Sequence, residues 1–234
     1  PRQIFEPPTV AELAMVAGLG QAVLAEQGVV QGEVLLTPIQ RWFFEQRLPE
    51  PHHWNQAMLL RTRVRIERDC LKKAVQVLLD HHDALRLRFA PIGHSPAGNG
   101  HQNDNLTRNA SGWRQYNAAR ETNEVVCWID LSGRHASEQR IAIETHAAAL
   151  QGSLDLARGP LMRVAYFDMG PRKDGRLLLI VHHLAVDAVS WQALLQDLQS
   201  AYDQVSRGRE ARLPLKTTSF RNWAHCLNQE VGSE

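Results

Sequence analysis

The sequence contains few cysteines, no long apolar run and no excess of charge of either sign. Cys70, Cys127 and Cys226 are far apart and form no CxxC pair, which excludes a disulfide-rich scaffold and a cysteine zinc site and favours reduced thiols in a cytoplasmic protein. No apolar run approaches a membrane span, and no signal-peptide pattern is present, so we expect neither insertion nor secretion. A net charge of +1 without a lysine-rich block disfavours nucleic acid and anionic membranes as partners.

Several common catalytic motifs are missing as well. There is no GxSxG nucleophile elbow, no HExxH zinc motif and no glycine-rich loop for phosphates or dinucleotides. The 11 histidines include three adjacent pairs, which begin at His52, His81 and His182. Adjacent histidines lack the i, i+4 spacing that places two ligands on one face of a helix, so we expect no metal site. The first two pairs are interpreted as loop and helix-end residues.

What is present is a mixture of strand-like and helical patterns over 234 residues, enough for one domain or slightly more. Apolar or alternating runs predict strands at 56–66, 84–91, 125–131, 159–169 and 176–183. Helical periodicity predicts helices at 68–82, 137–150, 189–205 and from about 218 onward, and another helix starts at Pro38 behind the cap residue Thr37. The glycine- and asparagine-rich stretch 93–112 is expected to be a surface loop.

These patterns indicate a mixed α/β fold. We expect the strand segments 56–64, 84–89, 161–167 and 177–183 to form one sheet. Helices at 71–82, 138–150 and 189–205 should flank that sheet.

The stretch "HHLAVDAVSW", residues 182–191, follows an apolar strand directly and carries the most chemistry. Neighbouring side chains on a strand point to opposite faces, so His182 and His183 cannot both face one cleft. A histidine at a strand end suits proton transfer near neutral pH, and Asp187 could orient it or could hold the loop through an arginine. A serine-hydrolase triad is disfavoured because Ser190 lies only seven residues from His183 within a single connection.

The same stretch resembles the HHxxxDGxS signature of the condensation-type domains of nonribosomal peptide synthetases, and its final tryptophan resembles the epimerization branch. Three further stretches agree in the expected order: "LTPIQRWFFEQ", "HHWNQAMLL" and "HHDALRLRF". The resemblance covers about residue 33 to the C-terminus. It implies a chloramphenicol-acetyltransferase-like α/β sandwich, of which 33–234 would be the N-terminal lobe only.

The segment before the lobe resembles another part of such synthetases. "IFEPPTVAELA" is similar to the closing helix of a peptidyl carrier domain, so 1–17 is interpreted as a carrier tail and 18–32 as a linker. The carrier's attachment serine is not present. The resemblance also implies a C-terminal lobe of the same domain as a partner of this lobe; in the family it carries a second acid–base group, a glutamate, and it is expected to be missing from this sequence.

The resemblance implies inversion at the α-carbon of an aminoacyl or peptidyl thioester, from L to D. His183 would be the catalytic residue, and His182 would pack inside the lobe. Asp187 would support the loop through an ion pair with Arg86, with Arg88 as the second choice.

Further roles follow from the same resemblance. Ser190 and Trp191 would line the pocket. No cofactor or metal would be bound, because the substrate arrives on the 4'-phosphopantetheine of a partner carrier domain. One departure from the pattern is Ala188, which replaces a glycine and would matter if that position needed a positive φ or close approach of the substrate.

Two alternatives stay open. In a condensation domain the same histidine would assist amine attack on a thioester. Such a domain is expected to have glycine after the aspartate of the signature, Asp187 here, and to lack the PIQxWF pattern that this sequence has at residues 38–43. A lobe that only docks carrier domains is the other alternative, favoured by Ala188 and by the expected missing half.

Overall fold

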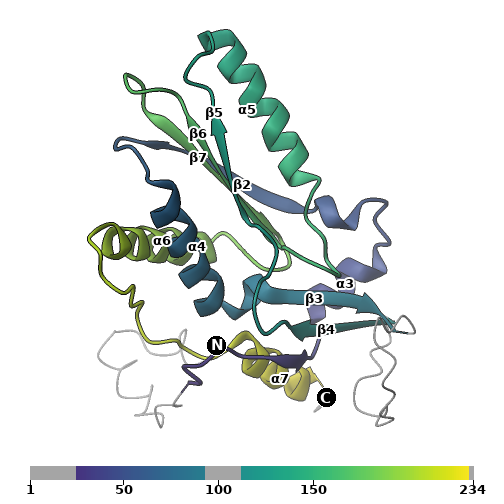
Figure 1. Cartoon of the computed structure of the whole chain (residues 1–234). Coiled ribbons are helices and arrows are strands. Elements are labelled where there is room, and N and C mark those ends of the chain that lie inside the picture. Colours follow the sequence, from purple (N-terminus) through teal and green to yellow (C-terminus); the bar gives the residue numbers. More distant parts are fainter. Residues whose placement is uncertain (1–24, 93–111, 232–234) are drawn as a thin grey trace, which may run out of the picture.

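The computed structural model describes residues 25–92 and 112–231. The predicted carrier tail at 1–17, the first part of the predicted linker and nearly all of the predicted loop at 93–112 lie outside these residues. Within the described part, the structure has the mixed α/β class expected from the sequence, but its strands form two sheets (Figure 1).

The larger sheet has four strands in the order β2-β7-β6-β5. These are β2 (Asn55–Thr62), β7 (Gly175–His182), β6 (Met162–Asp168) and β5 (Val126–Asp130). β6 and β7, which are neighbours in the chain, form an antiparallel hairpin, and β2 pairs antiparallel with β7. β5 and β6 are parallel because helix α5 (Ala136–Gln151) forms the crossover between them.

Helices cover both faces of this sheet, as Figure 1 shows. Alternate side chains of β7 enter two different cores: Leu179 and Val181 pack with α4 (Arg68–His81) and α6 (Ser190–Ser206), whereas Leu178 and Ile180 pack on the side of α5. The five apolar positions that predicted a buried face of α4 are all buried: Leu71, Ala74, Val75, Leu78 and Leu79. The predicted helices are therefore confirmed.

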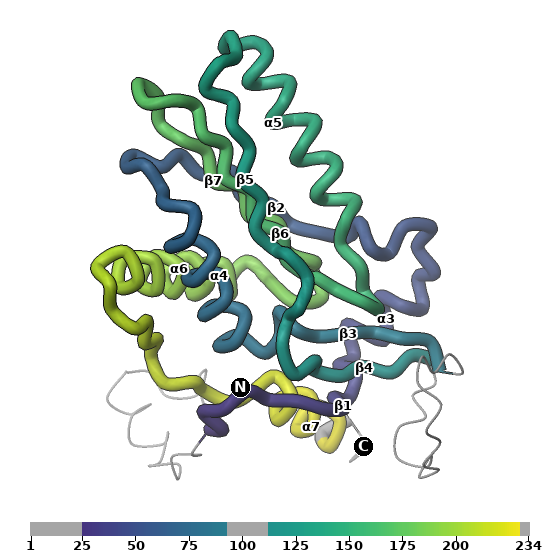
Figure 2. Tube along the Cα trace, viewed as in Figure 1, coloured from purple at the N-terminus to yellow at the C-terminus, as the bar shows by residue number. Residues whose placement is uncertain are grey.

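The smaller sheet lies below the larger one in Figure 1 and has the order β1-β4-β3. Its strands are β1 (Gly32–Val34), β4 (Trp113–Asn117) and β3 (Leu87–Pro91). Helix α3 (Pro38–Glu45) and helix α7 (Phe220–Val231) pack near it, and Figure 2 shows α7 beside β1. Thr37 and Gln40 form the capping box that starts α3, which confirms Thr37 as its cap.

One prediction about the sheets was wrong. The segment 84–89 was expected in the same sheet as the other three strands, but its strand, β3, belongs to the smaller sheet. The reason is the 3-10 turn η2 (Asp83–Arg86), which redirects the chain immediately after α4. Arg86 is fully buried in that turn and donates hydrogen bonds to the carbonyl oxygens of Val30, Asp80 and Ala118.

In the described part of the chain, no helix combines the length and the apolar character that crossing a bilayer would require.

Candidate active site around His183

His182 and His183 separate as the alternation of a strand requires. His182, the last residue of β7, is 0% exposed, and its Nε2 donates a hydrogen bond to the carbonyl oxygen of Pro51 at 2.8 Å. Its Nδ1 accepts the backbone N–H of Leu184 at 3.1 Å. Burial lowers the pKa of His182 to about 4, so this ring is neutral at physiological pH and serves packing.

His183 lies one residue past the end of β7. Its side chain is exposed, on the face of the strand opposite to that of His182. Its backbone N–H donates to the carbonyl oxygen of Trp54 at 2.8 Å, which continues the pairing of β7 with β2 by one residue. Trp54 is therefore the cross-strand neighbour of His183, and their rings stack with centroids 6.4 Å apart. The stacking on Trp54 and the backbone hydrogen bond together fix the position of the His183 ring at the end of the sheet.

Both ring nitrogens of His183 are hydrogen-bonded. Nδ1 lies 2.9 Å from the carbonyl oxygen of Val186, and Nε2 lies 3.0 Å from the side-chain nitrogen of Gln56. Gln56 is two residues beyond Trp54 on the same face of β2. Its side-chain oxygen accepts the indole N–H of Trp191, from the first turn of α6, at 2.7 Å.

A groove with a volume of about 790 Å³ opens beside His183, which is within the usual size of a small-molecule site. Its walls come from α3, the loop after β7 and α7, and they are mostly apolar or aromatic. The lining residues include Ile39, Trp42, Phe43, Trp54, Val186, Asp187, Ser190, Phe220, Trp223 and Leu227. Ser190 lies in the wall of this groove, whereas Trp191, also expected there, is 7% exposed and does not line it.

Asp187 does not pair with Arg86, so that prediction was wrong. Asp187 is exposed, and its Oδ1 accepts the backbone N–H and the hydroxyl of Ser190, both at 2.7 Å. These hydrogen bonds lower the pKa of the Asp187 carboxyl.

The two candidate arginines have other acidic partners. The Arg86 guanidinium bonds Asp83 at 2.6 Å in the turn after α4, and Arg88 pairs with Glu121 in a second buried ion pair. Arg86 lies in the turn between α4 and β3, and Arg88 lies in β3 itself. They therefore hold the body of the lobe together, and the loop that carries Asp187 depends on other contacts.

Ala188, which replaces the glycine of the signature, has an ordinary negative φ, since Arg47 is the only non-glycine residue with a positive φ in the described ranges. The backbone at this position therefore needs no glycine for its conformation.

One group of side chains could hold a metal ion. His81, His82 and Asp197 place their ligand atoms within 4.8 Å of one another between α4 and α6. His82 Nε2 lies 2.7 Å from Asp197 Oδ2, and burial lowers the pKa of both histidines. The positive charge of Lys216 lowers those pKa values further and would equally repel a cation, so the cluster is better explained as a contact between the two helices.

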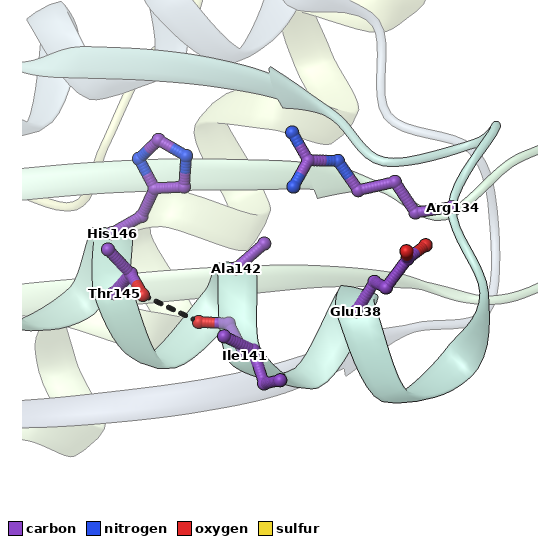
Figure 3. Close-up of a pocket in the computed structure, with 6 residues that line it drawn as sticks. All are labelled: Arg134, Glu138, Ile141, Ala142, Thr145 and His146. Atoms are coloured by element: carbon purple, nitrogen blue, oxygen red, sulfur yellow. Dashed lines mark hydrogen bonds between the residues drawn. The ribbon is translucent and has the colours of Figure 1, made fainter.

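A second hollow, of about 410 Å³, lies along α5 (Figure 3). Arg134 lies in the turn before α5 and His146 lies on the helix, and Ile141 is 57% exposed. Its lining shares no residue with the groove beside His183. The hollow along α5 therefore adds no side chain to the groove beside His183.

Comparison with known proteins identifies the family. The model of the condensation domain matches residues 30–234. The chain belongs to the condensation domain family. Curated relatives include a linear gramicidin synthase of Brevibacillus parabrevis, 47% identical over all of this chain and 4% of that protein, and chondramide synthase cmdD of Chondromyces crocatus, 41% identical over 6% of that protein.

Solved structures agree with this assignment. The epimerization domain from the third module of tyrocidine synthetase B is 37% identical, with a TM-score of 0.72 over 88% of this chain and 41% of that one. The starter condensation domain of rhizomide synthetase RzmA is 19% identical, with a TM-score of 0.66, and is a likeness of fold alone. The predicted chloramphenicol-acetyltransferase-like lobe is thus confirmed. The chain spans less than half of these solved domains and a few per cent of the curated relatives.

The sequence predicted His183 as a site residue but gave no indication that Trp54 and Gln56 contact it. Both stand in "HHWNQ", which was noted only for its resemblance to the epimerization branch. Their i, i+2 spacing on a strand was the available signal, because it places both side chains on one face. Which strand lies opposite that face depends on tertiary structure.

Proposed function

We propose that this chain is the histidine-bearing lobe of an epimerization domain, which inverts the α-carbon of an aminoacyl or peptidyl thioester held on the phosphopantetheine of a carrier domain. The observation that carries the proposal is the environment of His183. His183 lines the groove, its Nε2 lies 3.0 Å from the side-chain nitrogen of Gln56, and Gln56 in turn bonds Trp191; these two residues come from two of the stretches that resemble the epimerization branch.

In this mechanism His183 Nε2 takes the α-hydrogen as a proton, and the electron pair moves into the thioester carbonyl to form an enolate. A second acid on the opposite face of the α-carbon then delivers a proton to that carbon, which inverts the centre. We propose that the second group belongs to the other lobe of the domain. The apolar walls contributed by Trp42 and Trp223 would exclude water from the enolate.

Supporting evidence comes from the comparisons. The solved epimerization domain shares 37% of its aligned residues with this chain, about twice the share of the solved starter condensation domain at 19%. Peptide-bond formation is the second candidate, because the matching family model is that of the condensation domain. Docking of carrier domains without catalysis is the third, and it would need neither ring nitrogen of His183.

The test uses the full-length protein with a carrier-bound aminoacyl thioester in deuterated water. We expect deuterium to enter the α-position and the D-enantiomer to accumulate, and we expect His183→Ala to abolish both. His225→Ala, at an exposed histidine of α7 that does not line the groove, is the matched control and should keep most of the activity. Normal deuterium uptake by His183→Ala would overturn the proposal, and dipeptide formation without α-exchange would favour condensation.

A further inference from the structure

Three side chains form a continuous chain of hydrogen bonds that ends on the ring of His183. Trp191 lies 2.7 Å from the side-chain oxygen of Gln56, and the side-chain nitrogen of Gln56 lies 3.0 Å from His183 Nε2. On the other side of the ring, Nδ1 lies 2.9 Å from the carbonyl oxygen of Val186. The three side chains come from β2, α6 and the turn after β7.

The direction of each bond is fixed by chemistry. An indole N–H can only donate, so Trp191 requires Gln56 to present its oxygen there and its NH2 group to His183. An NH2 group can only donate, so His183 Nε2 must accept and carries no proton. A carbonyl oxygen can only accept, so His183 Nδ1 carries the proton.

The burial of this network differs along its length. Trp191 is 7% exposed and has no room to turn its N–H elsewhere, because it packs in the core between the larger sheet and α4. Gln56 is half-buried, and His183 reaches the groove. The buried Trp191 therefore fixes the orientation of the Gln56 amide. The amide in turn fixes which nitrogen of the exposed His183 ring accepts a hydrogen bond.

We infer that Gln56 and Trp191 are positioning residues that keep Nε2 of His183 unprotonated in the resting protein. This rests on the proposed function, in which Nε2 is the base. Once Nε2 has taken a proton, it faces the NH2 group of Gln56 as a second donor. A substrate that uses Nε2 must displace the N–H of Gln56 from it.

The inference is tested on the 234-residue chain with nitrogen-15 in its histidines, by two-bond proton–nitrogen correlation NMR at pH 8. His183→Ala identifies the signals of this ring. We expect the unchanged chain to show a protonated Nδ1 and a bare Nε2. The near-isosteric Gln56→Glu offers Nε2 an acceptor, and we expect its Nε2 to become protonated. Trp191→Phe removes only the indole donor and frees Gln56 to turn, so we expect a mixture of the two forms.

Two matched variants serve as controls. Gln192→Glu makes the same change at an exposed glutamine of α6, and Trp223→Phe changes a tryptophan that lines the groove. Neither should change the ring. A proton on Nε2 in the unchanged chain, or unchanged spectra for both Gln56→Glu and Trp191→Phe, would overturn the inference.

Activity is measured separately in the full-length protein. We expect Trp191→Phe to slow α-exchange in proportion to the fraction of rings that carry the proton on Nε2, so by about twofold for an even mixture, since only the form with a bare Nε2 can act as the base. If His183→Ala exchanges normally while the spectra behave as expected, the proposed function fails and the inference about the ring stands. If His183→Ala is inactive but the ring does not respond, only the inference fails.

Discussion

Asp187 and Ser190 form a helix cap, with Oδ1 of Asp187 accepting both the backbone N–H and the hydroxyl of Ser190 at 2.7 Å. The carbonyl oxygen of Asp187 also accepts the N–H of Trp191 at 3.2 Å, so the aspartate holds the turn that leads into α6. The carboxylate of the stretch therefore starts the helix that holds Trp191 against Gln56. It acts on His183 through the backbone of that helix.

Replacing Asp187 should thus have a modest effect on stability. We expect Asp187→Ala to lower the free energy of unfolding by about 1 kcal/mol, the usual cost of a lost cap, and well below the roughly 3–5 kcal/mol of a broken buried ion pair. Asp187→Asn keeps an acceptor and should lose less. Urea unfolding of both variants measures this, and a loss for Asp187→Ala above about 3 kcal/mol would contradict the cap.

Burial of His182 predicts a loss of stability in acid. Its pKa is about 4 in the folded chain, below the ordinary value of 6.5, so the unfolded chain binds the proton more tightly. The contribution is fully present above pH 6.5 and is lost as the pH falls towards 4, by about 3 kcal/mol in all. Unfolding measured from pH 7.5 to 4.5 should show this slope.

His182→Gln provides the control for that slope, because glutamine does not titrate. We expect the variant to be less stable at pH 7.5 but less sensitive to acid than the unchanged chain. The remaining acid sensitivity would come from His81 and His82, whose pKa values are also lowered. Equal slopes for His182→Gln and the unchanged chain would show that His182 is not the titrating group.

Gly159 and Gly208 offer a matched pair for a second stability test. Both have a positive φ, of 75° and 70°, but a Cβ at Gly159 would overlap the guanidinium of Arg88, whereas nothing lies within 4 Å at Gly208. We expect Gly208→Ala to cost about 1–2 kcal/mol from backbone strain alone. Gly159→Ala should cost clearly more, because the buried pair of Arg88 with Glu121 must shift. Similar melting temperatures for the two variants would exclude that overlap.

The exposed wall of the groove predicts how the 234-residue chain behaves alone. Ile39, Trp42 and Trp223 are 50–66% exposed on this face, and clustered apolar surface promotes association. We expect the chain to self-associate in sedimentation experiments and to accumulate no D-enantiomer. Trp223→Lys should weaken the association, whereas Ile141→Lys, on α5, should not. Steady inversion by this chain alone would show that both acid–base groups lie within it.

The sequence predicted those features that depend on local periodicity. The helical spacing of Leu71 to Leu79 and the alternation that separates His182 from His183 were both confirmed, because each follows from one element. The partners of Asp187 and Arg86 were not predictable in this way. Arg86 bonds Asp83 only three residues away and the distant Val30, and the choice between such partners is made when the two sheets pack.

The pairing of β2 with β7 has a consequence for synthesis on the ribosome. Leu59 and Leu178 are register partners about 120 residues apart. Because the ribosome adds roughly 5–20 residues per second, β7 is synthesised about 6–24 s after β2. Gln56 and His183 meet only through this pairing. The reactive centre is therefore assembled late, after α4 and α5 have left the ribosome, and slow codons or chaperones near residue 180 would act on the step that creates it.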